Sequence, residues 1–241
     1  MKIVLDTHTH TYVSGHAYNT MNEMAHAASC LGLELLCITD HAPKMPGSVT
    51  IMHFLNLKAC PRTKYGIRLA FGVEANILDY EGNIDMPEDI LERMDLCIAS
   101  IHPPCFQSGT VEENTSAYLG VMKNPHVNII GHPDDGRFPV DYSKLVHAAK
   151  ENHVALEVNN SSLKPGSFRP GARDNYKKML TLCKEFETPI TLGSDAHVEE
   201  DIADFALALE LLKELDFPEK LVLNSSVEKL QKFIDEKKAT C

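Results

Sequence analysis

The stretch Lys2-Ile3-Val4-Leu5-Asp6-Thr7-His8-Thr9-His10 decides the fold, because a short apolar run leads directly into a pair of histidines. Such a run, rich in aliphatic and β-branched residues, is typical of a strand that is buried on both faces of a parallel sheet. His8 and His10 then point to the same side of the chain, since strand side chains alternate with a period of two. The stretch therefore predicts a buried strand that presents two imidazoles at its carboxyl end.

The same layout, an apolar run followed by a potential ligand, recurs along the chain. Residues 35–40 precede His41, residues 69–73 precede Glu74, residues 96–101 precede His102, residues 127–131 precede His132, and residues 190–194 precede Asp195 and His197. Stretches of helical period lie between these runs, so we expect a βα repeat. In a closed or nearly closed parallel barrel the carboxyl ends of the strands meet at one mouth, where residues distant in sequence come together.

Nine residues of metal-ligand type lie at or just beyond these predicted strand ends. They are His8, His10, His16, His41, Glu74, His102, His132, Asp195 and His197. One histidine after a strand is more often a hydrogen-bonded loop residue than a ligand. The repetition at successive strand ends instead predicts a multinuclear metal site. Imidazole and carboxylate donors without paired thiolates favour Zn²⁺, with Mn²⁺ or Fe²⁺ as alternatives.

Length and composition limit the remaining possibilities. With 241 residues and 44% hydrophobic content, the chain can bury one sizeable core, and no linker-like segment interrupts it, so one domain over residues 1–241 is expected. The chain begins with a strand rather than a leader, and no apolar stretch approaches the length that spans a bilayer, which favours a cytoplasmic protein without a membrane partner. Seven cysteines without CxxC spacing are expected to be reduced thiols.

Charge and one unusual strand end bear on the substrate. The formal net charge of -11 makes nucleic acid an unfavourable partner, whereas bound cations at the mouth would still attract a small anion. The run at residues 154–158 ends in Asn159-Asn160-Ser161 and offers no obvious metal ligand. We therefore expect Asn160, Arg169 and Arg173 to contact substrate, because guanidinium groups suit phosphate oxygens.

The least regular stretch, residues 47–68, is expected to be a loop, and residues 199–214 are expected to form a helix.

The motifs together resemble those of the polymerase and histidinol phosphatase (PHP) superfamily. The matching segments are Asp6-Thr7-His8-Thr9-His10 with His16, Thr39-Asp40-His41, Gly72-Val73-Glu74, Ser100-Ile101-His102, Gly131-His132-Pro133 and Gly193-Ser194-Asp195-Ala196-His197. The resemblance spans nearly the whole chain, and no ligand position departs from it. Three further segments narrow it to the bacterial YcdX-type phosphatases: Ala17-Tyr18, Asn159-Asn160-Ser161-Ser162 and Val222-Leu223-Asn224-Ser225.

The resemblance implies an α/β fold, a distorted TIM-like (β/α)7 barrel, with three divalent metal ions that are usually zinc. By position, the first ion is held by His8, His10, Glu74 and Asp195, the second by His102 and His132 with Glu74 as a bridge, and the third by His16, His41 and His197. Residue patterns alone reach the cluster but not this partition. They also leave open an eighth strand at residues 220–224, where the family has seven. The resemblance favours Arg169 over Arg173 as a phosphate contact.

These features predict a metal-dependent phosphatase that hydrolyses small-molecule phosphate monoesters through a metal-activated hydroxide at a trinuclear site. Glu74, Asp195 and His197 are the residues expected to act in catalysis. The alternatives are a PHP-type phosphodiesterase or exonuclease and a non-catalytic metal-binding module. An amidohydrolase usually has a bridging lysine at a mid-barrel strand end, where this chain offers His102. The sequence does not name the substrate, and it leaves the oligomeric state open, a homo-oligomer included.

Overall fold

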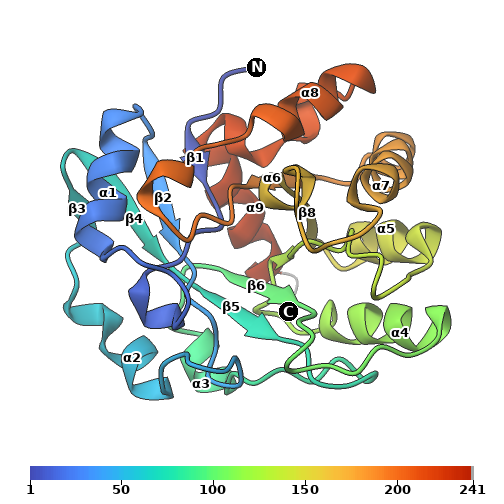
Figure 1. Cartoon of the computed structure of the whole chain (residues 1–241), viewed down its shortest axis with the longest axis horizontal. Coiled ribbons are helices and arrows are strands. Elements are labelled where there is room, and N and C mark those ends of the chain that lie inside the picture. The colour runs from blue at the N-terminus through green and yellow to red at the C-terminus, as the bar shows by residue number, and fades with distance from the viewer. Residues whose placement is uncertain (240–241) are drawn as a thin grey trace.

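A distorted barrel of strands forms the centre of the computed structural model, which describes residues 1–239 (Figure 1). The strands are β1 (Leu5–Asp6), β2 (Leu35–Ile38), β3 (Thr63–Lys64), β4 (Ile67–Phe71), β5 (Val73–Asn76), β6 (Cys97–Ser100), β7 (Ile129–Ile130), β8 (Ala155–Asn159) and β9 (Ile190–Gly193). They form two sheets, ordered β1-β2-β4-β3 and β5-β6-β7-β8-β9. Among the described strands, β3 alone pairs antiparallel, with β4.

The two sheets are halves of one barrel, because β4 and β5 are two parts of a single strand that bends at Gly72. A Cβ atom at Gly72 would lie 2.6 Å from the backbone oxygen of Leu96, so the bend requires glycine. Parallel bridges join His41 to Glu74 and Thr9 to Ala196, which links the sheets on both sides. With β3 set aside and β4 and β5 counted as one, seven parallel strands remain, and this confirms the predicted (β/α)7 barrel.

The segment at residues 220–224 closes the seam between β1 and β9 without forming an eighth strand. It consists of two 3-10 turns, η4 (Glu219–Leu221) and η5 (Leu223–Ser225), and makes one parallel bridge, from Val222 to Ile190. The buried Asn224 side chain accepts a hydrogen bond from Leu192 N at 2.7 Å and donates to Leu192 O at 2.8 Å and Leu5 O at 3.1 Å. One amide group thus satisfies backbone groups of both strands where they do not pair.

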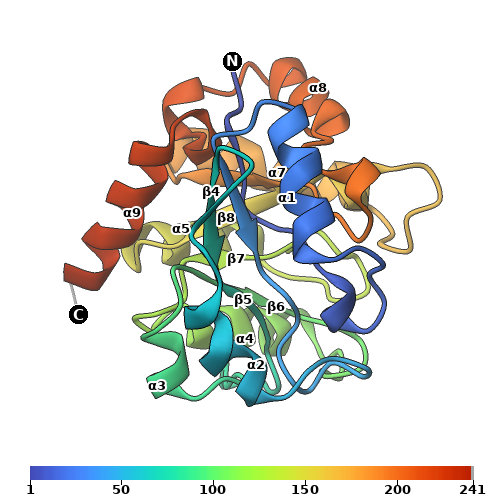
Figure 2. The ribbon, with the colours of Figure 1, turned by 90° about the vertical axis from the view of Figure 1, so that its left-hand side faces the viewer.

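Helices surround the strands in the order expected of a βα repeat (Figures 1 and 2). They are α1 (Met21–Cys30), α2 (Ile51–Asn56), α3 (Glu88–Leu91), α4 (Val111–Val121), α5 (Tyr142–Glu151), α6 (Asn160–Leu163), α7 (Ala172–Phe186), α8 (Ala206–Glu214) and α9 (Val227–Ala239). Capping boxes begin α1 at Thr20 and α4 at Thr110. Among residues 1–239, no helix is both long and apolar enough to cross a membrane.

Two local expectations need correction. The stretch at residues 47–68 is not simply a loop, since it contains α2, a 3-10 turn (Leu57–Ala59) and β3. Phe54 and Leu57 are buried there against the main core, which supplies the apolar contact that a loop would lack. The helix expected at residues 199–214 begins only at Ala206, because Glu199–Asp201 is a separate 3-10 turn and Ala203 adopts a left-handed φ of 56°.

The hydrophobic core has two parts that leave one end of the barrel for polar residues. The larger part lies between the strands and the helices around them. The smaller part joins Leu5, Leu35 and Ile98 to Phe233 and Ile234, so that α9 covers the barrel at the amino-terminal ends of the strands. In Figure 2, α9 lies on one side of the strands and the light-orange loop between α6 and α7 projects on the other. The six cysteines of the described residues are free thiols, and Cys241 lies outside those residues.

Candidate metal centre

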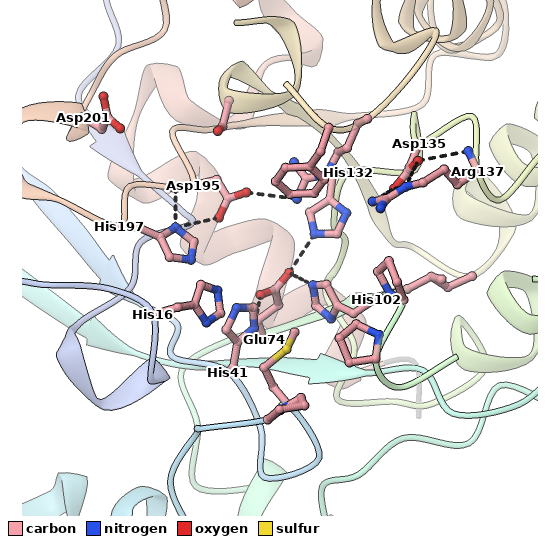
Figure 3. Close-up of a pocket in the computed structure, with 18 residues that line it drawn as sticks. His16, His41, Glu74, His102, His132, Asp135, Arg137, Asp195, His197 and Asp201 are labelled. Atoms are coloured by element: carbon pink, nitrogen blue, oxygen red, sulfur yellow. Dashed lines mark hydrogen bonds and ion pairs between the residues drawn. The ribbon is translucent and has the colours of Figure 1, made fainter. Parts of the chain in front are cut away.

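All nine predicted ligands meet at the carboxyl-terminal end of the barrel, and Figure 3 shows several of them around Glu74. Glu74 belongs to β5, and seven of the others follow directly on β1, β2, β6, β7 or β9. His16 comes from the loop after the 3-10 turn Tyr12–Ser14. Its ring centroid lies 4.9 Å from that of His41 and 4.7 Å from that of His197, which places it at the rim of the cluster.

The Glu74 carboxylate is the centre of the cluster. Its Oε1 lies 2.9 Å from His132 Nε2, 3.2 Å from His102 Nε2 and 3.4 Å from His8 Nε2. Its Oε2 lies 2.7 Å from His41 Nδ1. The two oxygens therefore face different imidazoles, and this arrangement allows one carboxylate to join two neighbouring cation sites.

Asp195 supplies a second carboxylate on the opposite side of the cluster. Its Oδ1 lies 3.3 Å from His10 Nε2 and 3.6 Å from His197 Nδ1, and its Oδ2 accepts a hydrogen bond from Arg169 at 3.2 Å. The backbones of Asp195 and His132 have left-handed φ values of 55° and 30°. Such conformations are strained in residues with a Cβ atom and collect at functional sites, where the fold holds a side chain in a required direction.

The donor atoms fit divalent cations because many of them are buried without another partner. His8 Nε2, His10 Nε2, His41 Nδ1, His197 Nε2 and Glu74 Oε2 make no hydrogen bond although they are shielded from water. A buried polar atom without a partner is costly, and a cation would satisfy several of these atoms at once. Three groups have donor atoms within 4.8 Å of one another: His10 with His41 and His197, His8 with His10 and Glu74, and His41 with Glu74 and His102.

In three of the histidines, Nδ1 points away from the cluster centre and contacts a side chain that the sequence did not lead us to expect. Glu157 Oε1 lies 2.7 Å from His8 Nδ1, Ser14 Oγ lies 3.1 Å from His10 Nδ1, and Asn76 Oδ1 lies 2.7 Å from His102 Nδ1. Ser14 Oγ in turn donates to Asp40 Oδ1 at 2.7 Å. Such contacts fix the orientation and tautomer of a ligating histidine.

Of these three residues, only Glu157 could have been recognised from the sequence. Glu157 is fully buried in β8, inside the one apolar run that carries no predicted metal ligand. An acidic residue within an otherwise apolar buried strand is itself unusual. It lies two positions before Asn159, on the same strand face, and Asn159 Nδ2 donates to Asp195 Oδ2 at 3.1 Å. Ser14 and Asn76 gave no comparable signal, since both are common polar residues near turns and strand ends.

Electrostatics favour ionised carboxylates at this site. Burial raises the pKa of Glu74, but the nearby His102, His8 and His41 outweigh it and hold that pKa well below the usual range. Burial likewise raises the pKa of Asp195, which His8, His10 and Arg169 bring well below its usual value. Ionised carboxylates are the form that binds cations.

Burial and neighbouring imidazoles favour the neutral form of His10 and His16, whereas the carboxylates around His8 act in the opposite direction. Burial lowers the pKa of His10 well below the usual value, and burial together with His41 and His197 lowers the pKa of His16 to about 4. Neutral imidazole is the form that coordinates metal ions. For His8, burial lowers the pKa but Glu157, Glu74 and Asp195 raise it well above the usual value, so negative potential is strong beside this residue.

A pocket of about 630 Å³ opens onto the cluster. Arg169 lines it and is 8% exposed, with one guanidinium nitrogen on Asp195 and another donating to Ser162 Oγ at 2.9 Å. The other two predicted substrate contacts lie elsewhere. Asn160 is buried and accepts a hydrogen bond from Ala208 N at 3.0 Å, while Arg173 forms ion pairs with Glu210 and Glu214 on the surface. Neither of them lines the pocket.

This barrel and its centre define a class of protein: TIM-like barrels with a cluster of histidine and carboxylate side chains, able to hold metal ions, at the carboxyl ends of the strands. Within that class, the chain belongs to the PHP domain family, whose model matches residues 6–161.

Curated relatives match almost the whole chain. A protein of Acetivibrio thermocellus named "Probable phosphatase" is 47% identical over 238 residues, which cover 99% of this chain and 98% of that protein. "Probable phosphatase Teth514_1060" of Thermoanaerobacter sp. is 47% identical over 239 residues, covering 99% of this chain and 97% of the relative. Among solved structures, histidinol phosphate phosphatase from Lactococcus lactis subsp. lactis Il1403, complexed with Zn, L-histidinol and phosphate, aligns with a TM-score of 0.60. That alignment covers 89% of this chain and 94% of the other at 20% identity, so it supports the fold alone.

Proposed function

We propose that this protein is a metal-dependent phosphatase that hydrolyses phosphate monoesters of small molecules. The observation that carries the proposal is the Glu74 carboxylate, set among imidazoles of which several buried nitrogens have no hydrogen-bond partner, with Arg169 on the neighbouring Asp195 in the same pocket. The curated relatives named as phosphatases support the same reaction. We further infer one PHP domain over residues 1–241, of which Thr240 and Cys241 lie outside the described residues.

Three cation sites are the arrangement that we propose for the nine ligands. His8, His10, Glu74 and Asp195 would hold the first, Glu74 with His102 and His132 the second, and His16, His41 and His197 the third. The three close donor groups share His10, His41 and Glu74, which supports cation sites that adjoin one another, and the donor types favour Zn²⁺. Bound cations would supply a water molecule of lowered pKa and neutralise phosphoryl oxygens.

The protein's own residues position the reaction. In the proposed mechanism Arg169 binds a non-bridging phosphoryl oxygen, since a guanidinium provides a planar set of donors and Asp195 already holds it at 3.2 Å. Glu74, Asp195 and His197 would hold cations that neutralise phosphoryl oxygens, and Glu157 fixes His8 through a contact of 2.7 Å. A pocket of about 630 Å³ suits a small ester better than a nucleic-acid strand.

Two changes test the proposal. Chelation of the purified protein and the Glu74→Ala substitution should each abolish hydrolysis of a chromogenic phosphate monoester, because each removes the bridging donor or its cations. Glu185→Ala, which changes an exposed glutamate on α7, serves as the matched control and should retain full activity. Metal analysis should find three ions per chain in the wild type and fewer in Glu74→Ala.

Two other outcomes would decide for the alternatives. A strong preference for phosphate diesters, measured at equal concentration with monoesters, would establish a phosphodiesterase. No turnover on a broad panel of esters by the fully metal-loaded protein would establish a non-catalytic metal-binding module. Activity that survives both chelation and Glu74→Ala would reject metal-dependent hydrolysis at this centre.

A further inference from the structure

The pocket has apolar lining residues that the phosphoryl group does not need. Its apolar lining residues come from the segments after β2, after β6 and before α7; they are Met45, Pro46, Ile101, Pro103, Pro104 and Phe168. A phosphate dianion gains nothing from such a surface, because burying a charge against apolar groups is unfavourable. These residues are therefore available to the alcohol part of a bound ester.

Phe168 is the distinctive member of this apolar lining. It is 69% exposed, and it is the one phenylalanine among the exposed large hydrophobic residues of the described chain. Guanidinium carbons lie 5.3 Å (Arg169) and 5.1 Å (Arg137) from its ring centroid. The ring thus adjoins both the arginine at the metal cluster and a second arginine farther along the pocket wall. Cation–π contacts of this kind hold an aromatic ring in place although water reaches it.

The guanidinium of Arg137 is held in place by Asp135. Asp135 accepts from its Nε at 3.0 Å and from its Nη2 at 2.6 Å, so the guanidinium is fixed by two bonds to one carboxylate. Figure 3 shows Asp135 and Arg137 on the side of His132 that faces away from His16 and His197. The pair therefore lies beside the cluster, on the wall of the same pocket.

We propose that the substrate is a phosphate monoester whose alcohol carries a planar aromatic ring, and that Phe168 and Arg137 are the residues that bind this ring. The proposal rests on the phosphatase activity proposed above. With the phosphoryl group at Arg169, the alcohol reaches Phe168, and its ring stacks on the phenyl face or on the guanidinium plane of Arg137. In the reaction, water oxygen forms a bond to phosphorus, the ester P–O bond breaks, and the alcohol leaves with one proton.

A matched pair of substrates tests this assignment. Benzyl phosphate and cyclohexylmethyl phosphate are both esters of primary alcohols with six-membered rings, and only the first ring is flat and aromatic. We expect kcat/KM to favour benzyl phosphate by about three- to tenfold, the range that one aromatic contact provides beyond burial of area. Phe168→Ala and Phe168→Leu should both bring the ratio to within about twofold of unity, the second while keeping apolar bulk.

Controls separate this effect from a general loss of activity. Met52→Ala removes another exposed apolar side chain, outside the pocket, and should keep the wild-type ratio. Arg137→Ala should lower the ratio, and Arg137→Lys should restore it only in part, because lysine keeps the charge but not the planar stacking surface. The same ratio in wild type, Phe168→Ala and Arg137→Ala would overturn the proposal.

Binding of inert analogues keeps failure of this inference distinct from failure of the proposed function. Calorimetry of the metal-loaded protein should show tighter binding of benzylphosphonate than of cyclohexylmethylphosphonate, again by about three- to tenfold, and Phe168→Ala should remove the difference. If neither ester is hydrolysed but the phosphonates show this difference, the ring-binding assignment holds and the phosphatase proposal fails. Equal binding of the two phosphonates would overturn the ring-binding assignment alone.

Discussion

At the scale of single residues, Glu157 explains how one imidazole of the cluster is oriented. Its carboxylate lies 2.7 Å from His8 Nδ1 and its other oxygen accepts from His132 N at 2.8 Å, so one side chain supports two predicted ligands. Chain order gives no sign of this contact, because Glu157 and His8 are 149 positions apart. Strand spacing predicts which residues face the mouth, but not which of their ring nitrogens faces a carboxylate.

Glu157→Gln should weaken cation binding without removing the site. The amide keeps the size of the side chain but loses the charge that orients His8, and changes of this kind typically cost about 10- to 100-fold in metal affinity. Competition with a chelator of known affinity measures the change, and Glu185→Gln on the surface of α7 is the matched control. Unchanged affinity would show that Glu157 serves packing alone.

Arg169→Lys should lower kcat/KM for a phosphate monoester by about 10- to 100-fold, since lysine keeps the charge but loses the planar donors on Asp195 and Ser162. We expect most of the loss in KM, with metal content unchanged. Arg173→Lys is the control, because Arg173 pairs with surface glutamates instead. A loss confined to metal content would show that Arg169 acts on the ligand Asp195 rather than on substrate.

At the scale of elements, the bend between β4 and β5 turns Glu74 into the barrel. Gly72 N donates to Ile38 O at 2.9 Å on one side, and Val73 N donates to Leu96 O at 3.3 Å on the other, so the strand changes its pairing at this glycine. The glycine of the Gly72-Val73-Glu74 motif is thus required by the backbone geometry of the bend. The glycine allows the close approach that places the carboxylate two residues later.

Gly72→Ala should destabilise the fold by about 2–4 kcal/mol, since the added methyl group would meet backbone 2.6 Å away and a packed core does not yield cheaply. Urea unfolding measures the change. Gly32→Ala is the control: its new methyl group meets nothing within 4 Å, and only its left-handed φ of 75° adds strain, at about 1–2 kcal/mol. An equal loss in the two variants would contradict the steric argument.

At the scale of the whole molecule, Asn224 closes the barrel. It is fully buried, and its amide serves backbone groups of both β1 and β9 where these strands do not pair directly. The predicted ligands His8 and Asp195 directly follow these same two strands. A buried amide near the end of the chain thus helps to set the relative position of two halves of the metal centre.

Asn224→Ala should lower the free energy of unfolding by about 2–4 kcal/mol, because it leaves buried backbone groups of Leu192 and Leu5 without partners. Amide hydrogen exchange should rise first in β1 and β9. Gln231→Ala, an exposed amide on α9, is the control and should change stability by less than about 0.5 kcal/mol. Uniform exchange across all strands would show that the seam does not open by itself.

The sequence by itself determined the barrel and the place where the predicted ligands gather. Period-two strands and their βα alternation are local properties, and the carboxyl ends of parallel strands necessarily share one mouth, so residues such as His8, Glu74 and His132 could be placed together in advance. Their binding of three cations stays a prediction, as does the cytoplasmic location.

Only the tertiary structure decided what each side chain faces. Asn160 and Arg169 follow the same strand, yet the fold turns the first toward Ala208 and the second toward Asp195. The supports Glu157 and Ser14, the seam at Asn224 and the exposed ring of Phe168 depend on contacts between segments far apart in the chain. Periodicity specifies the face of an element on which a residue lies. The partner across that face depends on how the elements pack, and no local sequence pattern contains that information.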